Sequence, residues 1–130
     1  MNIVIDYNGF ADRFSEKLTN IEDDISVRII ENGALGSNLC NATDTPFATN
    51  PNVTCGGQYL IVYNPDVISK CELFQSEQDA CLLHEIGHIL NKDENLDEVF
   101  KEMQCDNFAV KAGLAIALMN AIIKMNGLIF

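Results

Sequence analysis

Apolar residues near the start of the chain recur with the period of a helix. Phe10, Phe14, Leu18 and Ile21 are separated by four, four and three positions. In a helix this spacing places all four side chains on one face. The pattern therefore predicts a helix from about Phe10 to Asn20.

Two later segments have the pattern of β-strands. In ISVRII, residues 25–30, apolar and polar positions alternate, and Asn32-Gly33 ends the segment. QYLIVYN, residues 58–64, is rich in β-branched and aromatic residues. Between them, residues 33–57 contain many Gly, Asn, Thr and Pro residues with little periodicity, which predicts loops or short irregular strands.

The second half of the chain is predicted to be helical. Ser76 and Asp79 have the spacing of a capping box, so we expect a helix from Ser76 to about Leu90. A second helix is expected over residues 97–112 and a last one over residues 113–126.

The order of these elements predicts an α+β fold. We expect a small mixed sheet whose edge strand packs against the helix that begins at Ser76, with two to three further helices. A chain of 130 residues, 48% hydrophobic and 21% charged, can close one core but not two. Residues 1–130 are therefore expected to form a single domain.

The charge balance limits the partners. Eight Lys and Arg against nineteen Asp and Glu give a net charge of -11. Because phosphates need a basic surface, we expect no nucleic-acid partner. The apolar tail GLAIALMNAIIKMNGLIF is interrupted by Asn120, Lys124 and Asn126, so it lacks the run of about 18 apolar residues that a spanning helix needs. We expect no stable membrane insertion, and a helix that is buried or that contacts a partner or a second copy of the chain.

The cysteines and the first residues indicate a cytoplasmic protein. Five cysteines form an odd set without a CxxC pair, and no basic segment followed by a long apolar one begins the chain. We therefore expect reduced thiols, no secretory signal and a cytoplasmic location.

The segment HEIGH contains the two histidines of the chain. His84 and His88 are four positions apart, so on a helix both rings project from one face and can share a metal ion. Glu85 lies beside them, where it can activate a water. This pattern predicts a Zn²⁺ site with Glu85 as the catalytic base. A chance HExxH on an unrelated helix is the alternative.

A catalytic zinc ion needs a third protein ligand. The sequence has no third His, but Glu102, Asp106, Ala109 and Gly113 share one face of the next predicted helix. Glu102 is therefore the predicted third ligand, and Asp106 is predicted to accept a hydrogen bond from the far ring nitrogen of a ligating His. The small residues Ala109 and Gly113 would let the two helices approach closely. A solvated acidic face is the alternative for this helix.

These motifs resemble those of the gluzincin metallopeptidases. Residues 84–88 followed by EMQCD, residues 102–106, are similar to the pattern HExxH and then ExxxD. FKEMQCDNFAV resembles a segment of the ImmA/IrrE-like branch, and YLIVYNP is similar to the edge strand of that branch. The branch usually has Asn where this chain has Asp106, and Ala where it has Cys105. The resemblance covers roughly residues 58–112.

The resemblance implies a minimal zincin-like fold and a zinc metallopeptidase. Its zinc would be held by His84, His88 and Glu102, and Glu85 would act as general base in the hydrolysis of peptide bonds, on a specific intracellular protein. The substrate would pair in extended form along the strand residues Leu60, Ile61, Val62 and Tyr63.

Two other functions remain open. The chain could be a catalytically silent zincin scaffold that binds or regulates a partner, because no His or Tyr follows His88 to stabilise an oxyanion. Tyr59 and Tyr63 are candidates for that role, but packing is the commoner role of a strand tyrosine. A Cys as third ligand would instead indicate an amide hydrolase similar to peptide deformylase, whose EGC-type segment this chain lacks.

Overall fold

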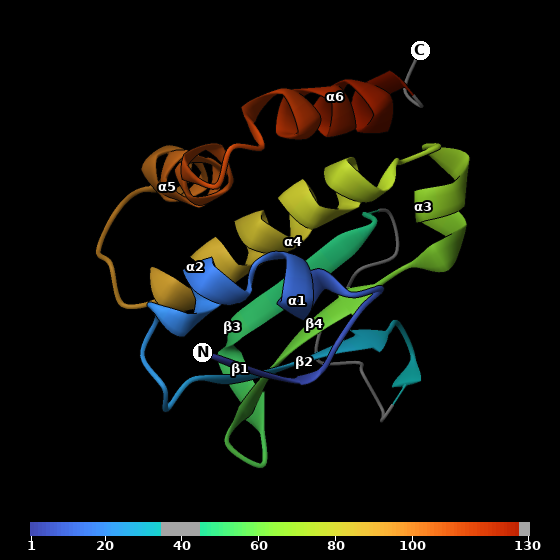
Figure 1. Ribbon diagram of the computed structural model, residues 1–130. Helices are drawn as coiled ribbons and strands as arrows, with labels where there is room; N and C mark the ends of the chain where they lie inside the picture. Colours follow the sequence, from blue (N-terminus) through green and yellow to red (C-terminus); the bar gives the residue numbers. More distant parts are fainter. Residues whose placement is uncertain (35–44, 128–130) are drawn as a thin grey trace.

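The computed structural model describes residues 1–34 and 45–127 (Figure 1). The strands are β1 (Asn2–Ile5), β2 (Ser26–Glu31), β3 (Phe47–Cys55) and β4 (Gln58–Tyr63). The helices are α1 (Phe10–Arg13), α2 (Ser15–Thr19), α3 (Pro65–Lys70), α4 (Gln75–Leu90), α5 (Glu98–Lys111) and α6 (Ala115–Asn126). The predicted α+β class is confirmed: a four-stranded mixed sheet is followed by helices that pack against it.

The strand order in the sheet is β1-β2-β4-β3. β1, β2 and β4 run parallel, and β3 runs antiparallel to β4. α4 lies across one face of the sheet, on the same side as α1 and α2, and α5 and α6 lie beyond α4 (Figure 1). α4 is therefore the central helix of the structure, in contact with the sheet on one side and with the last two helices on the other.

The prediction that residues Leu60 to Tyr63 form an edge strand is wrong. β4 lies inside the sheet, with β2 on one side and β3 on the other, and Leu60, Ile61 and Val62 are buried. Because both of its edges are already paired, β4 cannot pair with a substrate along residues Leu60 to Tyr63. Among the described strands, the edge next to α4 belongs to β3.

β3 occupies a segment for which loops or short irregular strands were predicted. Pro51 lies in its middle, and the register with β4 shifts between Thr49 and Thr54. A proline and an irregular register are tolerated at an edge, where one side of the strand donates no ladder hydrogen bonds. The part of the predicted loop at residues 35–44 lies outside the described residues.

The predicted first helix is two short helices. α1 and α2 are separated at Phe14, whose φ of -117 lies outside the helical range. Phe10 and Leu18 are nevertheless buried in the core, as the apolar spacing requires. β1 and α3 were not predicted, since four to six residues carry little periodicity.

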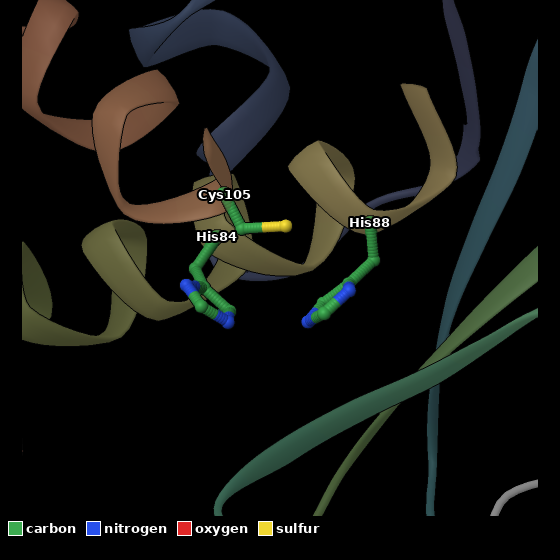
Figure 2. Close-up of side chains that lie close together, drawn as sticks. All are labelled: His84, His88 and Cys105. Carbon is green, nitrogen blue, oxygen red and sulfur yellow. The ribbon is translucent and has the colours of Figure 1, made fainter. Parts of the chain in front are cut away.

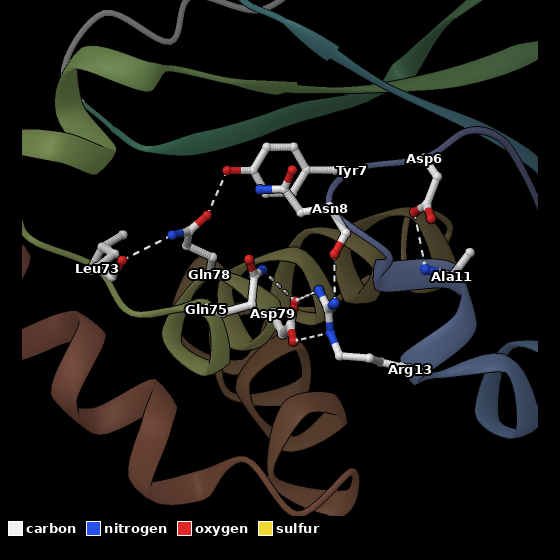
Figure 3. Close-up of polar contacts among 9 residues, drawn as sticks. All are labelled: Asp6, Tyr7, Asn8, Ala11, Arg13, Leu73, Gln75, Gln78 and Asp79. Atoms are coloured by element: carbon white, nitrogen blue, oxygen red, sulfur yellow. Dashed lines mark hydrogen bonds and ion pairs between the residues drawn. The ribbon is translucent and has the colours of Figure 1, made fainter.

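The prediction that Ser76 and Asp79 form a capping box at the start of α4 is also wrong. The helix begins at Gln75, and the Glu77 carboxylate accepts a hydrogen bond of 2.8 Å from the Phe74 N–H. Asp79 instead accepts two hydrogen bonds of 2.8 Å from the Arg13 guanidinium (Figure 3). This buried carboxylate therefore ties α1 to α4 and does not cap the helix.

The main core lies between α4 and the sheet. Leu82, Leu83 and Ile86 from α4 are fully buried there together with Ile29 and Ile61 from the strands. A second cluster on the opposite face of the sheet contains Ile30, Leu60 and Val62. The two clusters follow from the alternation of side chains along each strand.

The last two helices match the predicted boundaries. The carboxylate of Asp97 accepts a hydrogen bond of 3.1 Å from the Phe100 N–H at the start of α5, and Gly113, with φ +85, ends the helix. α6 is less buried than expected, because Ile116, Met119 and Ile123 are exposed. These three side chains form an apolar surface that is suited to a contact. Of the described helices, none combines the length and the apolar character that a membrane crossing requires.

Candidate metal centre

α4 presents its two histidines on the side that faces away from the core. Because Leu82, Leu83 and Ile86 fix one face of the helix in the core, His84 and His88 project from the other. Their ring centroids are 4.9 Å apart with an interplanar angle of 78°. Figure 2 shows the two rings next to each other, with a nitrogen atom of each nearest the other ring.

α5 supplies a carboxylate that contacts both rings. Glu102 Oε2 lies 3.0 Å from His84 Nε2, and Glu102 Oε1 lies 3.2 Å from His88 Nε2. Zinc bonds of about 2.0–2.2 Å separate tetrahedral donor atoms by about 3.4 Å. Each Nε2 atom therefore lies from one oxygen of Glu102 at a distance slightly less than the separation of two zinc donors, and imidazole and carboxylate are donor types that zinc accepts.

Asp106 lies one turn after Glu102 and contacts the other nitrogen of His84. The distance from His84 Nδ1 to Asp106 Oδ1 is 2.7 Å. With Nδ1–H donating to this carboxylate, Nε2 is left unprotonated and available to a metal. Partial burial lowers the pKa of His88, which also favours a neutral ring.

Cys105 is a further donor at this place. His84, His88 and Cys105 each offer one donor atom, and these three atoms lie within 4.8 Å of one another. The three residues could therefore also hold a metal ion. In Figure 2 the Cys105 sulfur extends from α5 over the gap between the rings. Burial, with the charges of Glu102 and Glu85, raises the pKa of the thiol to about 12. The sequence left a cysteine open as an alternative third ligand, and the structure shows that Cys105 is the cysteine that lies beside the two histidines.

Gly87 allows α4 and α5 to come this close. A Cβ atom at Gly87 would lie 2.8 Å from the Cα of Cys105 and 3.2 Å from its Cβ. The close approach was predicted at Ala109 and Gly113. Ala109 is indeed buried, but nothing lies within 4 Å of a Cβ at Gly113, whose role is to end α5.

Glu85 lies between the histidines and the edge of the sheet. Burial and the charge of Glu102 raise the pKa of Glu85 to about 8, and a hydrogen bond from the Thr49 backbone partly offsets this rise. A carboxyl group with a pKa near neutrality is suited to both taking and giving a proton. The Thr49 contact also shows that the edge of β3 faces the centre.

A cavity of about 470 Å³ opens beside these groups. His84, Glu85, Glu102 and Asp106 line one side of it. The rest of the lining is mostly apolar and includes Phe47 from β3 and Leu118, Ile122 and Met125 from α6. The contribution of α6 could not be predicted, because its apolar residues carry no sign of which face turns to the centre.

The two strand tyrosines lie elsewhere. The Tyr63 ring packs against Tyr7 at a centroid distance of 4.6 Å, and Tyr59 lies under the Lys92 ammonium at 5.2 Å. Neither residue lines the cavity that holds His84 and Glu85. Their contacts are those of packing residues.

The described cysteines are free thiols. Cys55 is exposed, whereas Cys71, Cys81 and Cys105 are buried. Cys40, the remaining cysteine of the sequence, lies outside the described residues.

Comparisons with protein-family models, with curated proteins and with solved structures found no match for this chain.

Proposed function

We propose that this chain is a zinc-dependent metallopeptidase of the gluzincin type, similar to the ImmA/IrrE-like branch, with a zincin-like fold. The observation that carries the proposal is the convergence of His84 Nε2 and His88 Nε2 on the Glu102 carboxylate, with Glu85 beside them. Two histidines and a glutamate are the ligands of a catalytic zinc that leaves one position open.

Zinc would be held by His84, His88 and Glu102, and when bound it supplies a Lewis acid and lowers the pKa of water. Glu85 takes the proton of the attacking water and passes it to the amine nitrogen that leaves. Asp106 holds the His84 ring through Nδ1 and keeps Nε2 directed at Glu102.

We assign the third ligand to Glu102 over Cys105 on geometric grounds. Both of the Nε2 atoms lie within 3.2 Å of the Glu102 carboxylate, and Asp106 engages the Nδ1 of His84. The metal therefore belongs on the Nε2 side of the rings, where Glu102 lies. The raised pKa of the Cys105 thiol also disfavours the thiolate form that a metal binds.

Elemental analysis and a hydrolysis assay test this proposal together. Purified wild type is expected to bind about one zinc per chain and to cut peptides from a mixed library. His84→Ala and Glu102→Ala should lose both properties, and Cys105→Ser should keep the zinc. Glu85→Gln should keep zinc and fold but lose hydrolysis. Zinc retained in Glu102→Ala and lost in Cys105→Ser would contradict the ligand assignment.

A second candidate function is that of a non-catalytic zinc protein. The observation in its favour is Cys105, since His84, His88, Glu102 and Cys105 together could complete a closed four-ligand site of the structural kind. Such a protein would bind zinc and still leave every peptide uncut. A deformylase-like activity with Cys105 as third ligand would be seen as release of formate from a formylated peptide.

A further inference from the structure

Two cavities of different character flank the histidines along β3. The first, the apolar cavity, is the one of about 470 Å³ lined by Phe47, Leu118, Ile122 and Met125 beside His84. The second, the lysine cavity, has a volume of about 260 Å³ and lies on the His88 side. Its lining includes Thr49, Asn52, His88, Lys92, Glu98 and Lys101.

The two cavities are arranged in sequence along the edge of β3 that no described strand pairs. Residues 45–47 border the apolar cavity, and Thr49, Pro51 and Asn52 border the lysine cavity. Glu85 lies between them, since it contacts the Thr49 backbone. From Phe47 to Asn52 a strand covers about 16 Å at roughly 3.3 Å per residue. An extended peptide of about five residues would therefore span both cavities and pass Glu85.

The backbone of β3 is oriented for such a peptide. The Pro46 carbonyl accepts a hydrogen bond from Asn64 N–H next to β4, so Pro46 faces into the sheet. Because successive residues alternate in direction, Phe47 and Thr49 turn their backbone groups to the edge that no described strand pairs. The Thr49 N–H is bonded to Glu85 there, which leaves the Thr49 carbonyl and the backbone groups of Phe47 for a peptide. Pairing at this edge would place alternate peptide side chains toward the helices that line the cavities.

The lysine cavity is unusual for such an acidic chain. The net charge is -11 with only eight Lys and Arg, yet this cavity has Lys92 and Lys101 against one acid, Glu98. Arg13 and Lys124 are engaged in ion pairs with Asp79 and Glu77. The ion pairs of the described residues include neither Lys92 nor Lys101. Lys92 contacts the Tyr59 side chain, and neither ammonium has a carboxylate partner among these ion pairs. A carboxylate that enters from outside can therefore pair with both.

We propose that the centre takes an extended peptide with a bulky apolar side chain on one side of the scissile bond and an acidic side chain on the other. The apolar side chain enters the cavity beneath Leu118 and Ile122. The acidic side chain enters the cavity at Lys92 and Lys101. The inference rests on the proposed peptidase function only where it speaks of a scissile bond. The binding of the peptide does not depend on that function.

Fluorescence anisotropy with zinc-loaded Glu85→Gln protein tests the inference, because this variant binds without cutting. The probes are labelled, C-terminally amidated peptides that contain a central Leu or Phe followed or preceded, two to three positions away, by Glu, Lys or Ala. The acidic peptide should bind about threefold to tenfold more tightly than the Lys peptide. Measurement near physiological ionic strength screens the repulsion from the rest of the acidic chain.

Charge reversal provides the decisive comparison. Lys92→Glu with Lys101→Glu should remove or reverse the preference for the acidic peptide. Lys70→Glu with Lys111→Glu is the matched control, because it changes the net charge equally at two exposed positions outside both cavities and should leave the preference intact. In the same assay, Ile122→Ser should weaken the binding of peptides with a central Leu or Phe more than the binding of matched peptides with a central Ala.

Each outcome decides between the two claims. The inference would be overturned if the acidic and basic peptides bound equally or if no peptide bound. It would also be overturned if the control variant lost the preference for the acidic peptide. Selective binding without cleavage by wild type would keep the two cavities as a peptide site and overturn the peptidase function instead. Cleavage by wild type without a charge preference would support the peptidase function and overturn the inference about the two cavities.

Discussion

At the scale of single residues, the arrangement of the centre depends on which nitrogen of His84 is engaged. Asp106 contacts Nδ1 at 2.7 Å, while Glu102 contacts Nε2 at 3.0 Å. The sequence predicted both contacts, because Glu102 and Asp106 are one turn apart and share a helix face. Cys105 was harder to place, since a buried cysteine beside a metal centre and one in a plain helix contact have the same sequence pattern.

Replacement of Asp106 tests its role as a positioning residue. Asp106→Ala removes the acceptor of the Nδ1 hydrogen bond, so the zinc affinity should fall by about 10- to 100-fold. Asp106→Asn keeps an oxygen that can accept the same hydrogen bond, so its zinc affinity should fall much less. Competition with a chromophoric chelator measures both affinities, and exposed Asp12→Ala provides the control. An unchanged affinity in Asp106→Ala would show that the ring is held by other contacts.

The thiols give a second prediction at this scale. Burial raises the pKa of Cys81 to about 12, so at neutral pH this thiol stays protonated and unreactive. Exposed Cys55 should react quickly with a thiol reagent in a Cys40→Ser background, while the three buried cysteines react only after unfolding. Mass spectrometry of the labelled peptides identifies the sites. Fast labelling of Cys81 in the folded chain would contradict the packing of α4 in the core.

At the scale of elements, long helices were predicted well and the sheet was not. α5 and α6 carry enough turns for period and end signals to agree, and Gly113 marks their junction. β3 was predicted only as loops or short irregular strands, because an edge strand with Pro51 has the composition of a loop. Without a defined β3, β4 was taken as the edge, because the order of strands depends on pairings between distant residues that no local pattern contains.

The contact between α4 and α5 gives a prediction at the scale of elements. In Gly87→Ala the new methyl group would lie 2.8 Å from the Cα of Cys105, and backbone cannot rotate away as a side chain can. We expect a loss of about 1–3 kcal/mol in the free energy of unfolding, with weaker zinc binding because Glu102 is moved away from the histidines. Urea unfolding measures the first effect and chelator competition the second.

Gly127→Ala is the matched control for this substitution. Its added Cβ meets nothing within 4 Å, and its φ of -61 suits alanine. Stability should therefore change little. If both variants unfold at the same urea concentration as wild type, the two helices do not approach as closely as the structure describes.

At the scale of the whole molecule, the centre joins several elements of the chain. Its side chains come from α4 and α5, Thr49 comes from the sheet, and α6 closes the apolar cavity. Glu85, Glu102 and Asp106 bring three carboxyl groups together in a chain whose net charge is already -11. A divalent cation would offset that repulsion and connect the two helices, so metal binding and folding should be coupled.

Metal removal tests this coupling. A ligand that binds only the folded chain stabilises it, so with the proposed site free zinc at about 1,000 times the dissociation constant should add about 4 kcal/mol to the free energy of unfolding. Thermal unfolding with zinc and with a chelator should therefore give well separated midpoints in wild type and in Glu85→Gln. In His84→Ala with His88→Ala the two midpoints should coincide, since the ligands are gone while the core residues of α4 remain. A zinc effect of equal size in that double variant would mean that the ion acts elsewhere on this acidic surface.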